Sequence, residues 1–233
     1  MSLFYAPDIE MLNLLPEEES AHCVRVLRKS EGDTITITDG KGFFYDARIT
    51  VPHPKRCEVE IAEKRQWTKP WSFSLHLVIA PTKNIDRIGW LAEKITELGV
   101  DTVTPLLCRF SERKELKPDR IQKILVSAMK QSRQALLPQL NPMTPFDAFM
   151  KGSFAGERYL AHCREGEKKT LPQCCVPGGS VTLLIGPEGD FSEDEVALAI
   201  QNGFVPVSLG ETRLRTETAA LFACCAVHTI NQR

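Results

Sequence analysis

Strand and helix patterns alternate along the chain from residue 72 to its end. Near-continuous apolar segments predict strands at 73–80, 102–107, 158–163, 181–186 and 204–210. Apolar residues at helical spacing, with capping residues, predict helices at 87–99, at 118–138, from Ser192 onward and at about 217–230. Strands that alternate with helices form a mostly parallel sheet covered on both faces. Residues 72–233 are therefore predicted to form one α/β domain.

The chain before residue 68 has a different pattern. Segments of alternating character predict strands at 34–39, 43–49 and 57–64, as in an antiparallel barrel or a small sheet. A short helix that ends in a turn is predicted within 21–33. Trp67, Pro70 and Trp71 interrupt both patterns, which places a boundary there and predicts a separate domain at 1–68.

Composition excludes several classes of protein. The chain has 233 residues, of which 42% are hydrophobic and 25% charged, so collagen-like and disordered classes are excluded. No apolar run reaches the roughly 18–20 residues of a membrane helix, and the first residues lack a basic leader. The eight cysteines show neither a CxxC pair nor zinc-ligand spacing. We therefore expect a cytoplasmic protein with no membrane segment, no disulfide framework and no metal site.

The net charge of −1 conceals an uneven distribution. Residues 1–67 carry −3, residues 68–145 carry +5 and residues 146–233 carry −3. The basic residues of the middle segment include Lys83, Arg87, Arg109, Arg113, Lys114, Lys117, Arg120, Lys123, Lys130 and Arg133. A basic stripe of this kind is suited to a phosphate backbone, although a solvated helix face has the same composition.

A first candidate site lies in LLIGPEGDFSEDE (183–195). The pattern of this segment predicts an apolar strand, a sharp Gly-Pro-Glu-Gly turn and a capped helix. Ligands of open α/β sheets bind beyond the carboxyl ends of the strands, where such turns lie. Gly186 and Gly189 allow a close approach of the backbone to a ligand. An ordinary strand-to-helix turn is the alternative.

A second candidate site lies in VSLGETRLRTETAALFACCAVH (207–228). A strand leads through Gly210 to a polar loop with Arg213 and Arg215, and then to a helix rich in alanine and cysteine. Small side chains allow another backbone to approach closely, which is typical of a tight packing site or a subunit interface. The alternative is a buried core helix.

Together these segments resemble the bacterial small-subunit (16S) ribosomal RNA uracil-N3 methyltransferases of the SPOUT class. IGPEGDFS is similar to the family's IGPEG signature, and LGETRLRTETA is similar to its LG…LRTETA signature. KITELGVDTVTPLLCRFSER (94–113) and HCVRVLRKSEGD (22–33) also resemble family segments, in the same order. The resemblance covers nearly the whole chain.

The resemblance implies a small PUA-like β-barrel that precedes a SPOUT-type parallel sheet with a C-terminal trefoil knot. It implies S-adenosylmethionine (SAM) as cofactor, 16S ribosomal RNA or the small ribosomal subunit as partner, a homodimer, and no metal. The SAM pocket is expected to comprise three loops. Its residues are Leu160, Ala161, His162, Ile185, Gly186, Pro187, Glu188, Gly189, Ser208, Leu209, Gly210, Leu214, Arg215 and Thr216.

The implied reaction removes the imide proton from N3 of uracil while negative charge develops on its carbonyl oxygens. Arg215 is the candidate for stabilising that charge and Glu217 for accepting the proton. Glu188 is a second candidate acceptor, and Glu217 can instead stabilise the start of its helix. His162 is expected to be structural, since one histidine at a strand end is more often structural than catalytic.

RNA contacts are expected from Arg25, Arg28, Lys29, Lys83, Arg109, Arg113 and Arg133. Three positions depart from the family pattern: Asp190 stands where glycine is usual, Thr212 where arginine is common, and Arg133–Gln134 where Gly-Arg is usual. Two alternatives stay open. A related SPOUT enzyme acts on another base or on a ribose 2′-hydroxyl, and a non-catalytic ribosome-assembly factor retains the fold without the reaction.

Overall fold

The computed structural model describes residues 2–232, which form two compact units. The first unit consists of the chain up to Lys69 together with Val126–Leu137. The second consists of Pro70–Leu125 and the chain from Pro138 onward.

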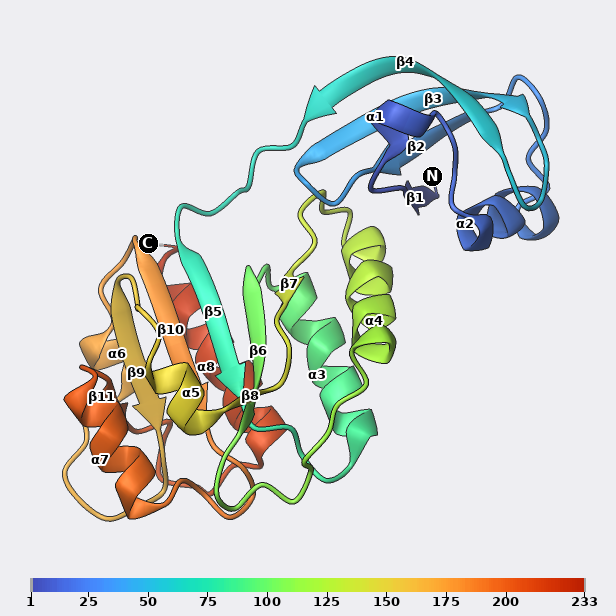
Figure 1. Ribbon diagram of the computed structural model, residues 1–233. Helices are drawn as coiled ribbons and strands as arrows, with labels where there is room; N and C mark the ends of the chain where they lie inside the picture. The colour runs from blue at the N-terminus through green and yellow to red at the C-terminus, as the bar shows by residue number, and fades with distance from the viewer. Residues whose placement is uncertain (1, 233) are drawn as a thin grey trace. The chain divides into compact units, whose positions relative to one another are not determined.

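The first unit is built on a four-stranded sheet in the order β1-β2-β3-β4 (Figure 1). The strands are β1 (Leu3–Tyr5), β2 (Thr34–Thr38), β3 (Phe43–Val51) and β4 (Glu58–Gln66). β2, β3 and β4 pair antiparallel, as the alternation predicts, while β1 pairs parallel with β2. The short strand β1 was not predicted, because three residues carry too little periodicity to be recognised.

Three short helices accompany this sheet: α1 (Ile9–Leu12), α2 (Glu17–Ala21) and the π-helix η1 (His22–Val26). The helix predicted within 21–33 therefore starts earlier, and Arg28 ends the turn with a φ of 54°. The core packs alternate residues of the strands, such as Ile37, Tyr45 and Ile49, against Phe4 and Ile9.

The segment after α4 (Pro118–Gln131) belongs to the first unit. The helix ends at Gln131 instead of at Pro138, and Arg133 has a φ of 56°. The Gly42 amide donates to the Ala135 carbonyl at 2.8 Å, and the Leu137 amide donates to the Gly40 carbonyl at 2.9 Å. These contacts span more than 90 positions in the sequence, so local pattern does not reveal them.

The second unit contains a seven-stranded sheet with the order β11-β9-β10-β5-β6-β7, in which β8 also pairs with β6. All its pairings are parallel, which confirms the predicted α/β class. Its strands are β5 (Ser74–Ile79), β6 (Thr102–Leu107), β7 (Gln139–Leu140), β8 (Thr144–Pro145), β9 (Glu157–Ala161), β10 (Ser180–Ile185) and β11 (Val205–Val207). The two-residue strands β7 and β8 were not predicted.

Helices cover both faces of this sheet (Figure 1). They are α3 (Ile85–Glu97), α5 (Phe146–Met150), α6 (Leu171–Cys174), α7 (Glu193–Gln201) and α8 (Thr216–Ile230). One core packs Leu75, Leu77 and Ile79 of β5 against α3 and α8, while Val78 of the same strand belongs to the core on the other face. Burial on both faces explains the near-continuous apolar strands.

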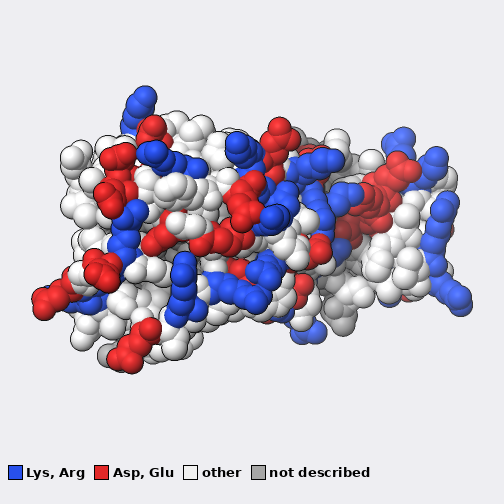
Figure 2. All heavy atoms as spheres, turned by 90° about the horizontal axis from the view of Figure 1, so that it is seen from below, with Lys and Arg blue, Asp and Glu red and all other residues white. Residues whose placement is uncertain are grey.

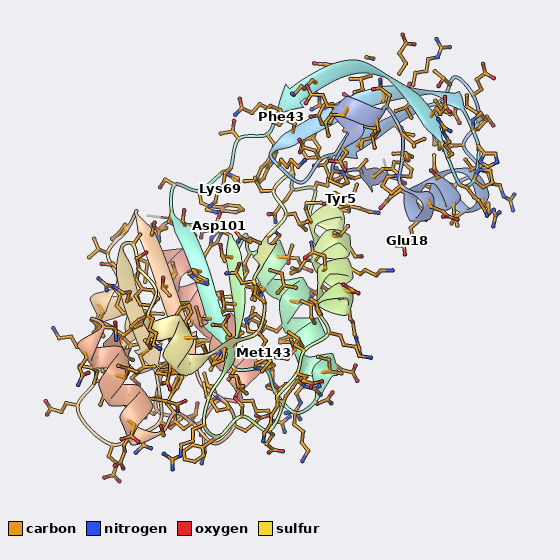
Figure 3. All side chains as sticks on the ribbon, viewed as in Figure 1. Tyr5, Glu18, Phe43, Lys69, Asp101 and Met143 are labelled. Atoms are coloured by element: carbon orange, nitrogen blue, oxygen red, sulfur yellow. The ribbon has the colours of Figure 1, made fainter. Side chains whose placement is uncertain are left out.

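The two ends of the sheet differ. At its amino end, the Asp101 carboxylate accepts a hydrogen bond from the Leu75 amide at 2.8 Å, beside the start of β6 (Figure 3). At its carboxyl end, α7 begins at a capping box in which Ser192 and Glu195 exchange hydrogen bonds, as predicted.

Across residues 2–232, no helix is long and apolar enough to cross a membrane.

Candidate active site

A cavity of about 850 Å³ lies at the carboxyl end of three adjacent strands. β9, β10 and β11 end at Ala161, Ile185 and Val207, and all three of these residues line it. Its further lining comes from three loops, the start of α8 and one residue of α3: His162, Cys163, Arg164, Lys168, Gly186, Pro187, Glu188, Asp190, Ser208, Leu209, Gly210, Glu211, Thr212, Arg213, Leu214, Arg215, Thr216, Glu217, Ala219 and Arg87. Basic and acidic side chains intermix at this end of the sheet (Figure 2).

The loop that follows β10 is held by close packing and by one carboxylate. A side chain at Gly186 would place its Cβ 2.9 Å from the Phe191 ring, so only glycine fits at that position. The Glu188 carboxylate accepts a hydrogen bond from the Lys83 amide at 3.0 Å. The apolar strand and the Gly-Pro-Glu-Gly turn thus bring a carboxylate and exposed backbone to the cavity.

Asp190 joins this loop to the loop that follows β9. Its carboxylate accepts hydrogen bonds from the Cys163 amide at 2.9 Å and from the Phe191 amide at 2.8 Å. Its φ is 64°, a left-handed conformation that aspartate tolerates better than most residues. The structure therefore accounts for the departure from glycine: the left-handed backbone is kept, and the added carboxylate binds two backbone amides.

The loop after β9 is fixed by two cations. Arg164 donates to the Phe191 carbonyl at 3.0 Å and to the Glu193 carboxylate at 3.0 Å. Lys168 donates to the His162 carbonyl at 2.9 Å. Burial, followed by the charge of Lys168, lowers the pKa of His162. A histidine with a lowered pKa next to two cations is a poor proton acceptor near neutral pH.

The loop after β11 runs beside the end of the loop after β9. The Ser208 amide donates to the Lys169 carbonyl at 2.9 Å, and the Leu171 amide donates to the Ser208 carbonyl at 3.2 Å. Thr170 and Ser208 form an isolated parallel bridge. Gly210 follows with a φ of 125°, a conformation that disfavours other residues. Segments about 40 residues apart in the sequence thus share one wall of the cavity.

A buried acid and a cation face each other at the start of α8. The Glu217 side chain is 9% exposed, and its Oε1 lies 3.6 Å from Nη1 of Arg87 on α3. Its Oε2 is buried without a hydrogen-bond partner among the described residues. Buried carboxylate oxygens are rarely left unpaired, so this atom is a candidate acceptor for a ligand hydrogen.

Twelve of the fourteen residues expected at the cofactor line the cavity, and so do the two candidate catalytic residues, Arg215 and Glu217. Leu160 lies fully buried in the core between the sheet and α5 and α7. Gly189 lies against Phe110. Arg87 was not expected at the site, because nothing in the pattern of α3 connects it with the start of α8, 130 positions away.

The candidate RNA contacts are divided between the two units. Arg25, Arg28, Lys29 and Arg133 belong to the first unit, and Lys83, Arg109 and Arg113 to the second. Lys83 is 2.8 Å from Glu112, and Arg109 is 3.6 Å from Asp194, with highly exposed basic side chains in both pairs. Arg113 instead donates to the carbonyls of Thr82 and Lys83, so it supports the loop before α3.

Two family models match this chain. The model of an RNA methyltransferase domain matches residues 69–228, and the model of an RNA methyltransferase PUA domain matches residues 15–62. The second model coincides with most of the four-stranded sheet of the first unit.

Solved structures and curated proteins give the same result. A probable rRNA-methyltransferase from Porphyromonas gingivalis is 42% identical, with a TM-score of 0.94 and coverage of 100% of this chain and 99% of the other. The ribosomal RNA small subunit methyltransferase E from Neisseria gonorrhoeae, bound to S-adenosyl methionine, is 29% identical, with a TM-score of 0.87 and coverage of 99% and 98%. Ribosomal RNA small subunit methyltransferase E of Buchnera aphidicola from Acyrthosiphon pisum is 27% identical over 96% of this chain and 90% of its own length. The chain belongs to the RNA methyltransferase family.

Proposed function

We propose that this protein is a SAM-dependent methyltransferase that methylates N3 of a specific uridine in small-subunit (16S) ribosomal RNA. The observation that carries the proposal is the cavity at the ends of β9, β10 and β11, which brings both signature segments of the sequence together. The N. gonorrhoeae relative, which shares the fold, is bound to SAM.

The lining suits the chemistry of SAM. Apolar side chains such as Ile185, Leu209 and Leu214 provide a surface for an adenine ring, and strand-end backbone groups provide donors and acceptors for its edge. The carboxylate of Glu188 offers an acceptor for hydroxyl or ammonium hydrogens. When bound, SAM supplies an electrophilic methyl group on a positively charged sulfonium.

The chain's own residues have two tasks in this reaction. Glu217 accepts the N3 proton at Oε2, while Arg87, beside Oε1, keeps the carboxylate in one orientation. Arg215, the residue that precedes α8, stabilises the negative charge that develops on the uracil carbonyl oxygens. Burial of Glu217 excludes water from the acceptor, which strengthens both electrostatic effects.

Several finer features belong to the same proposal. The passage of the chain from β11 beside residues 169–171 into α8, which packs against β5 and β10, supports a trefoil knot in the C-terminal part. The antiparallel strands β2–β4 and the matched PUA domain support a PUA-like barrel. We further propose a cytoplasmic homodimer, with the small side chains of α8 near the contact between copies, and 16S ribosomal RNA or the small subunit as partner.

The decisive experiment is transfer of a labelled methyl group from SAM to small subunits that lack the modification, followed by nucleoside mapping by mass spectrometry. We expect label in N3-methyluridine at a single position. Label in another base or in a 2′-O-methyl ribose would replace this assignment with a related reaction. RNA binding without SAM binding in calorimetry would indicate a non-catalytic assembly factor.

A further inference from the structure

Phe110 is a large apolar side chain that is 45% exposed, in the turn after β6 at the carboxyl end of the sheet. This turn is well fixed. The Cys108 amide donates to Ser111 Oγ at 3.0 Å, and the Arg109 amide donates to the Glu195 carboxylate at 2.8 Å. The exposure of the ring is therefore a property of an ordered turn and not of a loose loop.

The ring lies next to the loop that borders the cavity. A Cβ added at Gly189 would lie 2.9 Å from the Cβ of Phe110, so the backbone at Gly189 packs closely against the side chain of Phe110. The residues on both sides of Gly189, namely Glu188 and Asp190, line the cavity. Glycine at position 189 thus permits an exposed aromatic ring to lie directly outside the candidate active site.

One basic group lies beside this ring. The Arg109 guanidinium lies 5.9 Å from the ring centre, and its side chain is 65% exposed. Lys83, whose side chain is 79% exposed, lies 2.8 Å from Glu112, two positions after Phe110 in the sequence. An exposed pair such as Arg109 with Asp194 is weak and easily exchanged for a phosphate.

An exposed aromatic ring beside arginine, at the entrance of a site, is the combination that proteins use for unstacked bases. The base stacks on the ring while the guanidinium binds the adjacent phosphate. We propose that Phe110 stacks on a nucleobase of the RNA substrate and positions it at the entrance to the cavity, with Arg109 on the neighbouring phosphate. This inference rests on the proposed function and identifies a further substrate-binding residue for it.

The test compares Phe110→Ala, Phe110→Leu and Phe110→Trp with the wild type, and uses Ile200→Ala as the matched control. Ile200 is 48% exposed on α7. Methyl transfer is measured against the concentration of unmodified small-subunit RNA at saturating SAM, and RNA affinity is measured separately by fluorescence anisotropy. Phe110→Ala and Phe110→Leu are expected to raise KM and Kd for RNA roughly tenfold. Phe110→Trp and Ile200→Ala stay near wild type.

A change in SAM affinity or in thermal stability is not expected for any of these variants. RNA affinity that is equal in Phe110→Ala, Phe110→Leu and wild type overturns the inference. So does a change confined to the oligomeric mass, which assigns Phe110 to a contact between copies. If the wild type transfers no methyl group, the proposed function fails, and the anisotropy measurement still decides the stacking on its own.

Discussion

Arg87 and Glu217 form an ion pair at 3.6 Å between α3 and the start of α8, at the lining of the cavity. The cation is partly exposed and the acid is buried, with the second carboxylate oxygen lacking a partner within residues 2–232. One oxygen is thus held by the protein, and the other has no hydrogen-bond partner among the described residues. The mechanism proposed above depends on this difference between the two oxygens of the Glu217 carboxylate.

Glu217→Gln is expected to lower the rate of methyl transfer about 100-fold or more, because a general base contributes a factor of this size. Glutamine keeps the shape and the buried volume, so SAM affinity stays within a fewfold of wild type. Single-turnover transfer and calorimetry measure the two effects. Glu211→Gln, an exposed carboxylate of the same cavity, is the control. Full activity in Glu217→Gln would remove this residue from the proton transfer.

Arg215→Ala is expected to lower kcat about 100-fold with little change in KM for RNA, because charge on the uracil oxygens develops mainly in the transition state. Arg213→Ala is the matched control, since Arg213 lines the same cavity two positions earlier. Steady-state kinetics separate the two parameters. If kcat falls further in Arg213→Ala than in Arg215→Ala, Arg213 is the residue that stabilises the charge on the uracil oxygens.

Asp190→Ala removes the acceptor of the Cys163 and Phe191 amides and leaves a Cβ at a φ of 64°. SAM affinity is expected to fall about tenfold, since the loops after β9 and β10 lose their connection. Asp190→Gly loses the same hydrogen bonds but tolerates the left-handed backbone. Denaturant unfolding should therefore find Asp190→Ala less stable than Asp190→Gly by about 1 kcal/mol. Equal stability would show that the backbone conformation changes in the alanine variant.

Acid is expected to destabilise the second unit through His76. Burial lowers the pKa of His76 to about 4, and its Nε2 lies 2.7 Å from Thr104 Oγ1. The folded state binds a proton less readily than the unfolded chain, so stability is lost as pH falls from about 6.5 towards 4. The loss amounts to about 2 kcal/mol at pH 5.

Urea unfolding at pH 7.5 and at pH 5 measures this effect in the wild type and in His76→Gln. The variant is expected to show a smaller difference between the two pH values. His53→Gln, at an exposed position of the first unit, is the control. A pH difference that is unchanged in His76→Gln would assign the acid sensitivity to other groups, such as His228, whose pKa burial also lowers.

RNA binding is expected to weaken steeply with salt, because phosphate contacts release counterions. Arg109→Ala should reduce the slope of log K against log salt by about 1. Lys151→Ala, at an exposed position, is the control. Arg113→Ala is expected to lower thermal stability more than the salt slope, because its guanidinium donates to two backbone carbonyls. A salt-independent affinity would exclude the basic residues of the middle segment from the interface.

The sequence itself predicted the longer strands and helices of the second unit, but not β7, β8, α5 or α6. Apolar runs such as 102–107 and the Ser192–Glu195 capping box are local signals, and the structure has the corresponding elements at nearly the same positions. The carboxyl ends of parallel strands lie at one edge of a sheet, but the expectation that these three loops form one pocket came from the resemblance to the family. Through that resemblance, twelve of the fourteen residues expected at the cofactor were identified from the sequence.

Only the tertiary structure decided which groups meet across long sequence separations. Three contacts illustrate this. Arg87 pairs with Glu217 across 130 positions, and Phe110 packs against Gly189 across 79 positions. The Gly42 amide binds the Ala135 carbonyl across 93 positions, which attaches residues 126–137 to the first unit. Hydrophobic periodicity specifies which face of an element is buried, but it does not specify which other element covers that face. Side chains from distant segments come together only when the packed core sets the distances between their backbones, and this is the physical reason that the pairing of Arg87 with Glu217 is visible only in the folded chain.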